Sequence, residues 1–322
     1  MIARIHILLS IVFILFVNAR VNICFSQQEP MYTQNNFDRL VFNPAYAGSS
    51  GWIVNSFKHR TQFTGVEGAP QTQMFTIHAP WQIKSMGFGG KIVNDKLGAT
   101  SQLNVNVITS YHLGIGDGKL SVGLELGMFS QSIDFSQLHK VNPVDQAIPT
   151  EKQSVARPDG AFGIQYQAVN RKKKREYFIG FSIQHLFGSD LNFTGKERSM
   201  VGELSKHYFL SGGYAFDYKN GISLQPCFLL KKVAGAPSQL DLYINTIYKE
   251  KYTLGIGYRT SDAMTFVVKY HITDAIRISY SYDMRISQIA KYSSAAHEIM
   301  LRYGIKLLPP QQIKEINPRF YF

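Results

Sequence analysis

The sequence predicts an all-β protein, a transmembrane antiparallel β-barrel of about 14 strands. Over the last hundred residues, apolar and polar residues alternate in runs of about ten. One such run has Ile276, Ile278 and Tyr280 on its apolar face and Arg277 and Ser279 on its polar face. Successive side chains of a strand point to opposite faces, so a period of two indicates strands. A tilted strand needs about 9–11 residues to cross a bilayer, which matches these runs.

The same alternation and the lengths of the connections give the barrel its extent, residues 51–307. Connections after even-numbered strand candidates are short, as at 116–118, and most of those after odd-numbered candidates are longer, as at 131–159 and 188–205. Outer-membrane barrels sort their short periplasmic turns and longer outer loops in this way, whereas a soluble all-β sandwich has no reason to. The candidates are 51–60, 71–81, 84–94, 102–113, 119–130, 160–170, 176–187, 206–218, 221–231, 238–249, 251–260, 264–272, 275–285 and 296–307.

Residues 1–26 have the pattern of a secretory signal peptide. Arg4 precedes a short apolar run, and small residues fit the positions before a cleavage site that follows Ser26. The apolar run is too short to span a membrane as a helix. A lipoprotein signal with Cys24 as the lipidated residue is the alternative, although Ile23 is bulky for the position before it.

Cleavage after residue 26 would leave residues 27–50 as a periplasmic leader ahead of the barrel. It would also leave Cys227 as the one cysteine, which excludes an internal disulfide or a cysteine-based zinc site. Losing Arg4 and Arg20 lowers the net charge from +12 to +10. An exported basic protein meets phosphate mainly as lipopolysaccharide or lipid headgroups, so nucleic acid is not expected as a partner.

No residue pattern points to catalysis, a metal or a cofactor. The nine histidines are scattered and show no metal-ligand spacing. Nothing singles out a serine, histidine and acid that would converge as a catalytic triad. The basic run 171–175 lies between two strands and is interpreted as a solvated turn. We therefore expect no enzymatic activity and no cofactor.

Charged residues on the polar face of the last strands are candidate lumen residues. An Arg on the lipid side would cost roughly 2–4 kcal/mol at the bilayer midplane, so these charges belong inside. They could line an aqueous pore, or they could pair across adjacent strands and fill the lumen. The sequence leaves this choice open. The candidates are Arg259, Arg277, Asp283, Arg285, Glu298 and Arg302.

Several motifs together resemble the PorP/SprF family of outer-membrane proteins of the type IX secretion system. They are spread from the start of the predicted mature chain to its last strand, so the resemblance covers essentially all of it. The combination of NPAYAG with GAPQTQ and HAP is specific. The motifs are Asn43-Pro44-Ala45-Tyr46-Ala47-Gly48, Arg60 with Gly65, Gly68–Gln73, His78–Pro80, Asn94–Lys96, Gly257–Arg259, Tyr280–Asp283 and Ser294–Leu301.

The resemblance implies an outer-membrane protein of Bacteroidota without enzymatic activity. Such a protein would act through contacts with the periplasmic lipoprotein ring of the secretion system, or with a large secreted adhesin of the kind used in gliding motility. Its other contacts would be with outer-membrane lipid and lipopolysaccharide. A passive porin-like channel is the alternative from another class, and a membrane-embedded enzyme is the third.

Two segments outside the strands carry further expectations. The NPAYAG motif is expected as a rigid turn at the periplasmic mouth of the barrel, since Pro44 fixes φ and Gly48 permits a positive φ. It would serve either to close the barrel or to contact a partner. Pro309 and Pro310 end the last strand, which leaves residues 308–322 as a periplasmic tail with five large apolar side chains in its last ten residues.

Overall fold

The computed structural model describes residues 29–81, 85–137, 151–170, 175–192, 201–234, 236–287, 290 and 295–306. The predicted signal peptide and the predicted tail 308–322 lie outside the described residues, as does most of the basic run 171–175. No helix in the described part of the chain has the length and the apolar character needed to cross a membrane.

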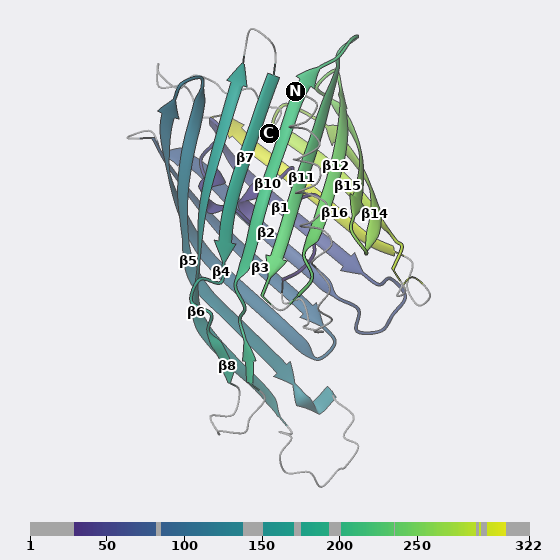
Figure 1. Cartoon of the computed structure of the whole chain (residues 1–322). Helices are drawn as coiled ribbons and strands as arrows, with labels where there is room; N and C mark the ends of the chain where they lie inside the picture. The colour runs from purple at the N-terminus through teal and green to yellow at the C-terminus, as the bar shows by residue number, and fades with distance from the viewer. Residues whose placement is uncertain are drawn as a thin grey trace, which may run out of the picture.

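A closed barrel of 14 antiparallel strands confirms the predicted fold (Figure 1). Each strand pairs with its neighbours along the chain, except that β7 pairs with β10, and β1 pairs with β16 to close the barrel. The barrel strands are β1 (Trp52–Gln62), β2 (Gln71–Trp81), β3 (Met86–Leu97), β4 (Thr100–Ile115), β5 (Gly118–Asp134), β6 (Lys152–Asn170), β7 (Arg175–Gln184), β10 (His207–Asp217), β11 (Ile222–Val233), β12 (Gln239–Tyr248), β13 (Tyr252–Arg259), β14 (Ala263–His271), β15 (Ile276–Arg285) and β16 (Ala295–Lys306).

The connections differ from the sequence expectation at three places. β3 and β4 run further than predicted and meet in a tight turn at Gly98, which has a φ of 55°. The predicted loop 131–159 is shortened because β5 and β6 continue as a two-stranded ribbon. The predicted loop 188–205 contains a separate hairpin of β8 (Asp190–Asn192) and β9 (Val201–Glu203). Such pairings depend on backbone hydrogen bonds that apolar periodicity does not reveal.

The two ends of the barrel are distinguished by these connections. The long-loop end carries the β5–β6 and β7–β10 connections and lies at the bottom of Figure 1. The short-turn end carries tight turns such as Gly116–Asp117 and Tyr218–Gly221. β1 begins and β16 ends at the short-turn end.

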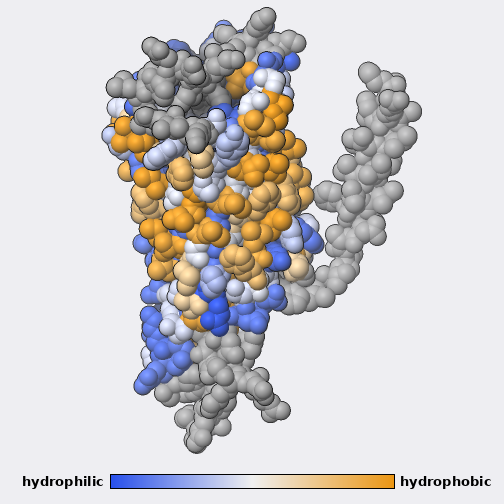
Figure 2. Space-filling model, turned by 90° about the vertical axis from the view of Figure 1, so that its left-hand side faces the viewer, coloured by the Kyte–Doolittle hydropathy of each residue, from blue (hydrophilic) through white to orange (hydrophobic). Residues whose placement is uncertain are grey.

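Side chains alternate between the lumen and the outer face, as the sequence predicts. Along β13, Leu254 is 61% exposed, whereas Thr253 beside it is 2% exposed. Figure 2 shows hydrophobic residues gathered in a broad band across the middle of the face in view. The rings of Tyr252 and Tyr258 lie on this outer face toward the two ends of β13. Aromatic residues at both edges of an apolar band are typical of a membrane-spanning barrel.

The apolar band predicts a depth-dependent cost for a charge. We expect Leu254→Arg to lower the free energy of unfolding by about 2–4 kcal/mol, because Leu254 lies between the two tyrosine levels, near the bilayer midplane. Tyr252→Arg is the matched control, on the same face and nearer the interface, and should cost about 0–1 kcal/mol. Urea unfolding in lipid vesicles measures both values. Equal losses would show that this face does not meet lipid as described.

The leader lies inside the barrel, which corrects its expected place in the periplasm. Residues from Met31 to Ser50 are almost all buried, although they form only two short 3-10 turns, η1 (Arg39–Val41) and η2 (Pro44–Tyr46). A third 3-10 turn, η3 (Phe135–Gln137), follows β5. Polar side chains of the barrel wall satisfy the leader's backbone groups, which is what allows irregular chain to be buried there.

Candidate functional site

The leader threads the lumen from one end of the barrel to the other. It begins beside His185, just after β7 at the long-loop end, and it ends at Ser50, where β1 starts at the short-turn end. The space left between the leader and the wall near Phe178 and Tyr243 is about 10 Å³. That volume is close to the minimum that holds one water molecule, so the lumen is filled there.

Three ionisable groups hold the start of the leader at the long-loop end. The imidazole of His185 lies 2.5 Å from Glu29 and 2.8 Å from Asp159 on β6. Burial lowers the pKa of His185, but its hydrogen bonds to Asp159 and Glu29 outweigh burial and raise that pKa to about 9. Burial raises the pKa of Glu29, but the hydrogen bond and the charge of His185 outweigh it and bring the pKa to about 2. The contact therefore stays ionic at neutral pH.

A cluster of buried charges on the wall lies next along the leader, and we call it the Arg60–Asp283 cluster. Its guanidinium groups bridge several carboxylates: Arg60 lies 2.6 Å from Asp283 and 3.1 Å from Glu298, and Arg259 lies 3.3 Å from Asp283. The cluster has four basic and four acidic side chains, so its opposite charges balance within a buried site. Its members are Arg60, Lys231, Asp241, Arg259, Asp262, Asp283, Arg285 and Glu298.

The leader docks on this cluster through Thr33 and Gln34. The hydroxyl of Thr33 donates to Asp283 at 2.6 Å, and it accepts hydrogen bonds from Arg60 and Arg259. The backbone N–H groups of Thr33 and Gln34 donate to the carboxylate of Glu298 at 2.9 and 3.1 Å. Hydrogen bonds to charged groups are stronger than those between neutral groups. The cluster therefore binds both the backbone and the side chain of the leader strongly.

Two further lysines of the wall hold the middle of the leader. Lys58 on β1 lies 3.5 Å from Asp38. Lys91 on β3 donates to the carbonyl of Val41 at 3.1 Å while it pairs with Glu125 at 2.8 Å. A buried ammonium group needs such partners, because burial otherwise penalises its charge heavily. Both lysines thus have an oppositely charged partner within 3.5 Å, and Lys91 also binds the leader's backbone.

The NPAYAG motif fills a cradle made by glycines of the wall. A Cβ atom at Gly163 would lie 2.1 Å from the Oδ1 atom of Asn43, and one at Gly123 would lie 2.3 Å from the nitrogen of Ala45. A Cβ atom at Gly87 would lie 2.3 Å from the carbonyl oxygen of Ala47. Real Cβ contacts are not this short, so three strands carry glycine where the turn presses against them.

Hydrogen bonds fix the motif in this cradle. The side chain of Asn43 accepts from the N–H of Ala45 and donates to the carbonyl of Ile164 at 3.2 Å. The N–H of Gly48 donates to the Nδ1 atom of His78, and the φ of Gly48 is 62°, as the sequence predicts. Because Tyr46 and Ala47 are fully buried, a partner could not reach the motif while the leader occupies the lumen.

The six lumen charges proposed from the sequence are all buried, but they do not form one group. Four belong to the Arg60–Asp283 cluster: Arg259, Asp283, Arg285 and Glu298. Arg277 and Arg302 face each other across β15 and β16, further toward the short-turn end. Arg302 donates to the carbonyl of Phe37 in the leader. Of the two alternatives, a pore lining or paired charges, the four cluster residues are found as ion pairs.

Sequence reasoning missed the contribution of the first strands. Arg60 was named only as part of a family motif and not as a lumen charge. Lys58 and Lys91 were not predicted to face the lumen. A signal was available in β1, where Ser56, Lys58 and Arg60 follow one another at steps of two on the same face. Among the described residues no group of His, Cys, Asp and Glu side chains is arranged to hold a metal ion.

Solved structures with a similar fold include two toluene transporters and a hydrocarbon channel. The Ralstonia pickettii toluene transporter TbuX has a TM-score of 0.51 and 11% identity, over 83% of this chain and 92% of that one. The Pseudomonas putida toluene transporter TodX has a TM-score of 0.50 and 10% identity, over 88% and 95%. The CymD monoaromatic hydrocarbon channel matches with the same four values as TodX. At these identities the likeness shows the fold alone.

The curated proteins contain no match to this sequence. A family model described as type IX secretion system membrane protein PorP/SprF matches residues 24–303, which is most of the chain and nearly all of the barrel. The fold and the match together make this an outer-membrane β-barrel of a secretion system. The chain belongs to the PorP/SprF family of type IX secretion system membrane proteins.

Proposed function

We propose that this protein serves type IX secretion through contacts with other proteins and not as a passive channel. The observation that carries the proposal is the filled lumen, in which the leader runs from Glu29 at one end to Ser50 at the other. A porin conducts because its lumen is filled with water. Here the charged and polar groups of the wall bind the leader and not a solute. The two ends of the barrel are therefore the surfaces through which it would contact other proteins.

The short-turn end is the proposed contact with the periplasmic lipoprotein ring. Bacterial outer-membrane barrels place their short turns in the periplasm. β16 ends at Lys306 on this side, and the sequence after it is the predicted periplasmic tail. Its apolar residues suit a docking role, because burying each would gain roughly 1.5–3 kcal/mol.

The long-loop end is the proposed contact with a large secreted adhesin. Residues Lys152–Ala161 of β6 pair with β5 only, so the β5–β6 ribbon continues past β7. The side chain of Arg157 donates to the carbonyl of Asp190 at 2.9 Å, which joins this ribbon to the β8–β9 hairpin. A two-stranded ribbon that is hydrogen-bonded to a hairpin is stiffer than a loop. Rigid elements make better interaction surfaces because less conformational entropy is lost on binding.

Two measurements on the purified protein and one on cells test the proposal. In planar bilayers the full-length barrel should give no steady current, and periplasmic lipoproteins should co-purify with the tagged protein. Replacing residues 190–203 with a short flexible linker should keep the barrel and these partners but lower the amount of adhesin retained on cells. Replacing the 286–294 connection at the same end is the control. Steady current without partners would favour the porin-like alternative.

A further inference from the structure

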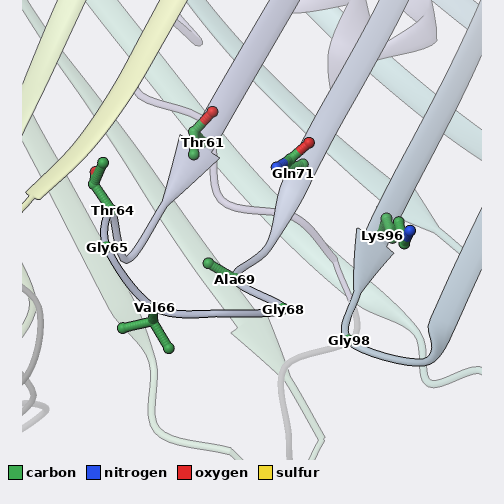
Figure 3. Close-up of a pocket in the computed structure, with 9 residues that line it drawn as sticks. All are labelled: Thr61, Thr64, Gly65, Val66, Gly68, Ala69, Gln71, Lys96 and Gly98. Carbon is green, nitrogen blue, oxygen red and sulfur yellow. The ribbon is translucent and has the colours of Figure 1, made fainter. Parts of the chain in front are cut away.

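A pocket of about 330 Å³ lies against β1, β2 and β3 at the long-loop end of the barrel (Figure 3). Its wall is formed by Thr61, Gln71 and Lys96, one residue from each strand. The connection 63–70 between β1 and β2 runs across it and adds Thr64. The leader in the lumen takes no part in this pocket.

The pocket opens on the outer face of the barrel. Thr61, Gln71 and Lys96 alternate with Gln62, Thr72 and Asp95, of which Gln62 and Thr72 are buried and Asp95 accepts a hydrogen bond from Thr72. Since neighbouring residues of a strand point to opposite faces, the three pocket residues point outward.

The pocket lies just beyond the lipid-facing band. On the same outward face, Phe57, Phe75 and Ile92 are 46%, 39% and 45% exposed, and each is the last apolar residue before the polar positions of its strand. The pocket residues lie four positions further along, and each pair of residues advances about 6.8 Å along a strand. With the tilt of the strands, this places the pocket at the level of the lipid headgroups.

The 63–70 connection, which forms one side of the pocket, is held in place by backbone hydrogen bonds. The N–H of Gly98 donates to the carbonyl of Gly68 at 2.9 Å, and the N–H of Gln62 donates to that of Pro70 at 3.0 Å. Gly65 and Gly68 have φ values of 92° and 71°, which only glycine adopts readily. A pocket whose walls are held in this way is largely formed before a ligand arrives.

The groups in the pocket suit a phosphorylated sugar. Lys96 offers an ammonium group, and Gln71 offers an amide that can donate and accept. The hydroxyl of Thr61 also contacts His59, and that of Thr64 donates to the carbonyl of Ala295, so Thr64 offers a ligand its oxygen lone pairs. None of the nine described residues that line the pocket is acidic. We propose that this pocket binds the phosphorylated saccharide headgroup of an outer-leaflet lipid, of the lipid A type. The inference goes beyond the secretion role and does not rest on it.

Native mass spectrometry of the full-length barrel in detergent tests the site. The probes are a bisphosphorylated glucosamine lipid, the same lipid without phosphates, phosphatidylglycerol and inorganic phosphate. We expect the phosphorylated glucosamine lipid to be retained best, and Lys96→Gln to weaken its binding about fivefold, as the loss of one basic contact with an anionic lipid implies. Thr61→Val with Gln71→Leu should weaken both glucosamine lipids.

Lys232→Gln is the matched control. Lys232 is also exposed and outward-facing, one residue before the end of a strand at the long-loop end, but it lies on β11. Equal losses for Lys96→Gln and Lys232→Gln would overturn the proposal. So would equal retention of phosphatidylglycerol, which would indicate a general attraction to anionic lipid, or full competition by inorganic phosphate, which would indicate a free-anion site. Heat-modifiable mobility checks that each variant is folded.

Discussion

Deleting leader residues 29–46 is expected to convert a silent barrel into an open pore. The 14 strands close through β1 and β16 without the leader, so the wall should survive the deletion. The lumen that remains is lined by polar and charged side chains and should fill with water. In planar bilayers the deletion variant should give a steady current where the full-length protein gives none. Deletion of residues 311–322, outside the barrel strands, should leave the protein silent.

A substitution in the wall should have the same effect without shortening the chain. Gly123→Val places side-chain atoms where the turn of Pro44 and Ala45 lies, so the leader cannot seat. Gly114→Val is the matched control on β4, because a Cβ atom there meets nothing within 4 Å. A current from Gly123→Val but not from Gly114→Val would support the leader as a plug. Silence of both the deletion and Gly123→Val would contradict it.

Removing the carboxylate of Asp283 is expected to cost the barrel about 3–5 kcal/mol of unfolding free energy. Asp283 is fully buried and pairs with both Arg60 and Arg259, so Asp283→Ala leaves these two buried guanidinium groups with one carboxylate fewer and the cluster with an unbalanced positive charge. The leader also loses the acceptor for the hydroxyl of Thr33. Denaturant unfolding in vesicles measures the loss, and bilayer current shows whether the leader is released as well.

Asp274→Ala is the control for this effect. Asp274 lies in the exposed turn before β15, the strand that carries Asp283, and an exposed charge of this kind contributes less than about 1 kcal/mol. Asp283→Asn should lie between the two, because the amide keeps one acceptor but loses the charge. If Asp283→Ala were no worse than Asp274→Ala, the Arg60–Asp283 cluster would not be what secures the leader.

The strands and their faces could be predicted because they depend on local pattern. Lipid on one side and a polar lumen on the other impose a period of two, as at Leu254 and Thr253, and no distant residue is needed to detect it. Strand ends were less predictable. β5 and β6 continue past the apolar band, where both faces meet water and apolar and polar residues no longer alternate.

The sequence by itself determined the barrel, its strand number, its lipid-facing residues and, through its motifs, its family. Only the tertiary structure decided that the leader fills the lumen. A buried irregular segment has no period, and its partners lie far away in the chain: Thr33 and Asp283 are 250 residues apart. The need for glycine at Gly87, Gly123 and Gly163 could not be predicted from the sequence either. Each of them makes room for a turn that comes from another part of the chain.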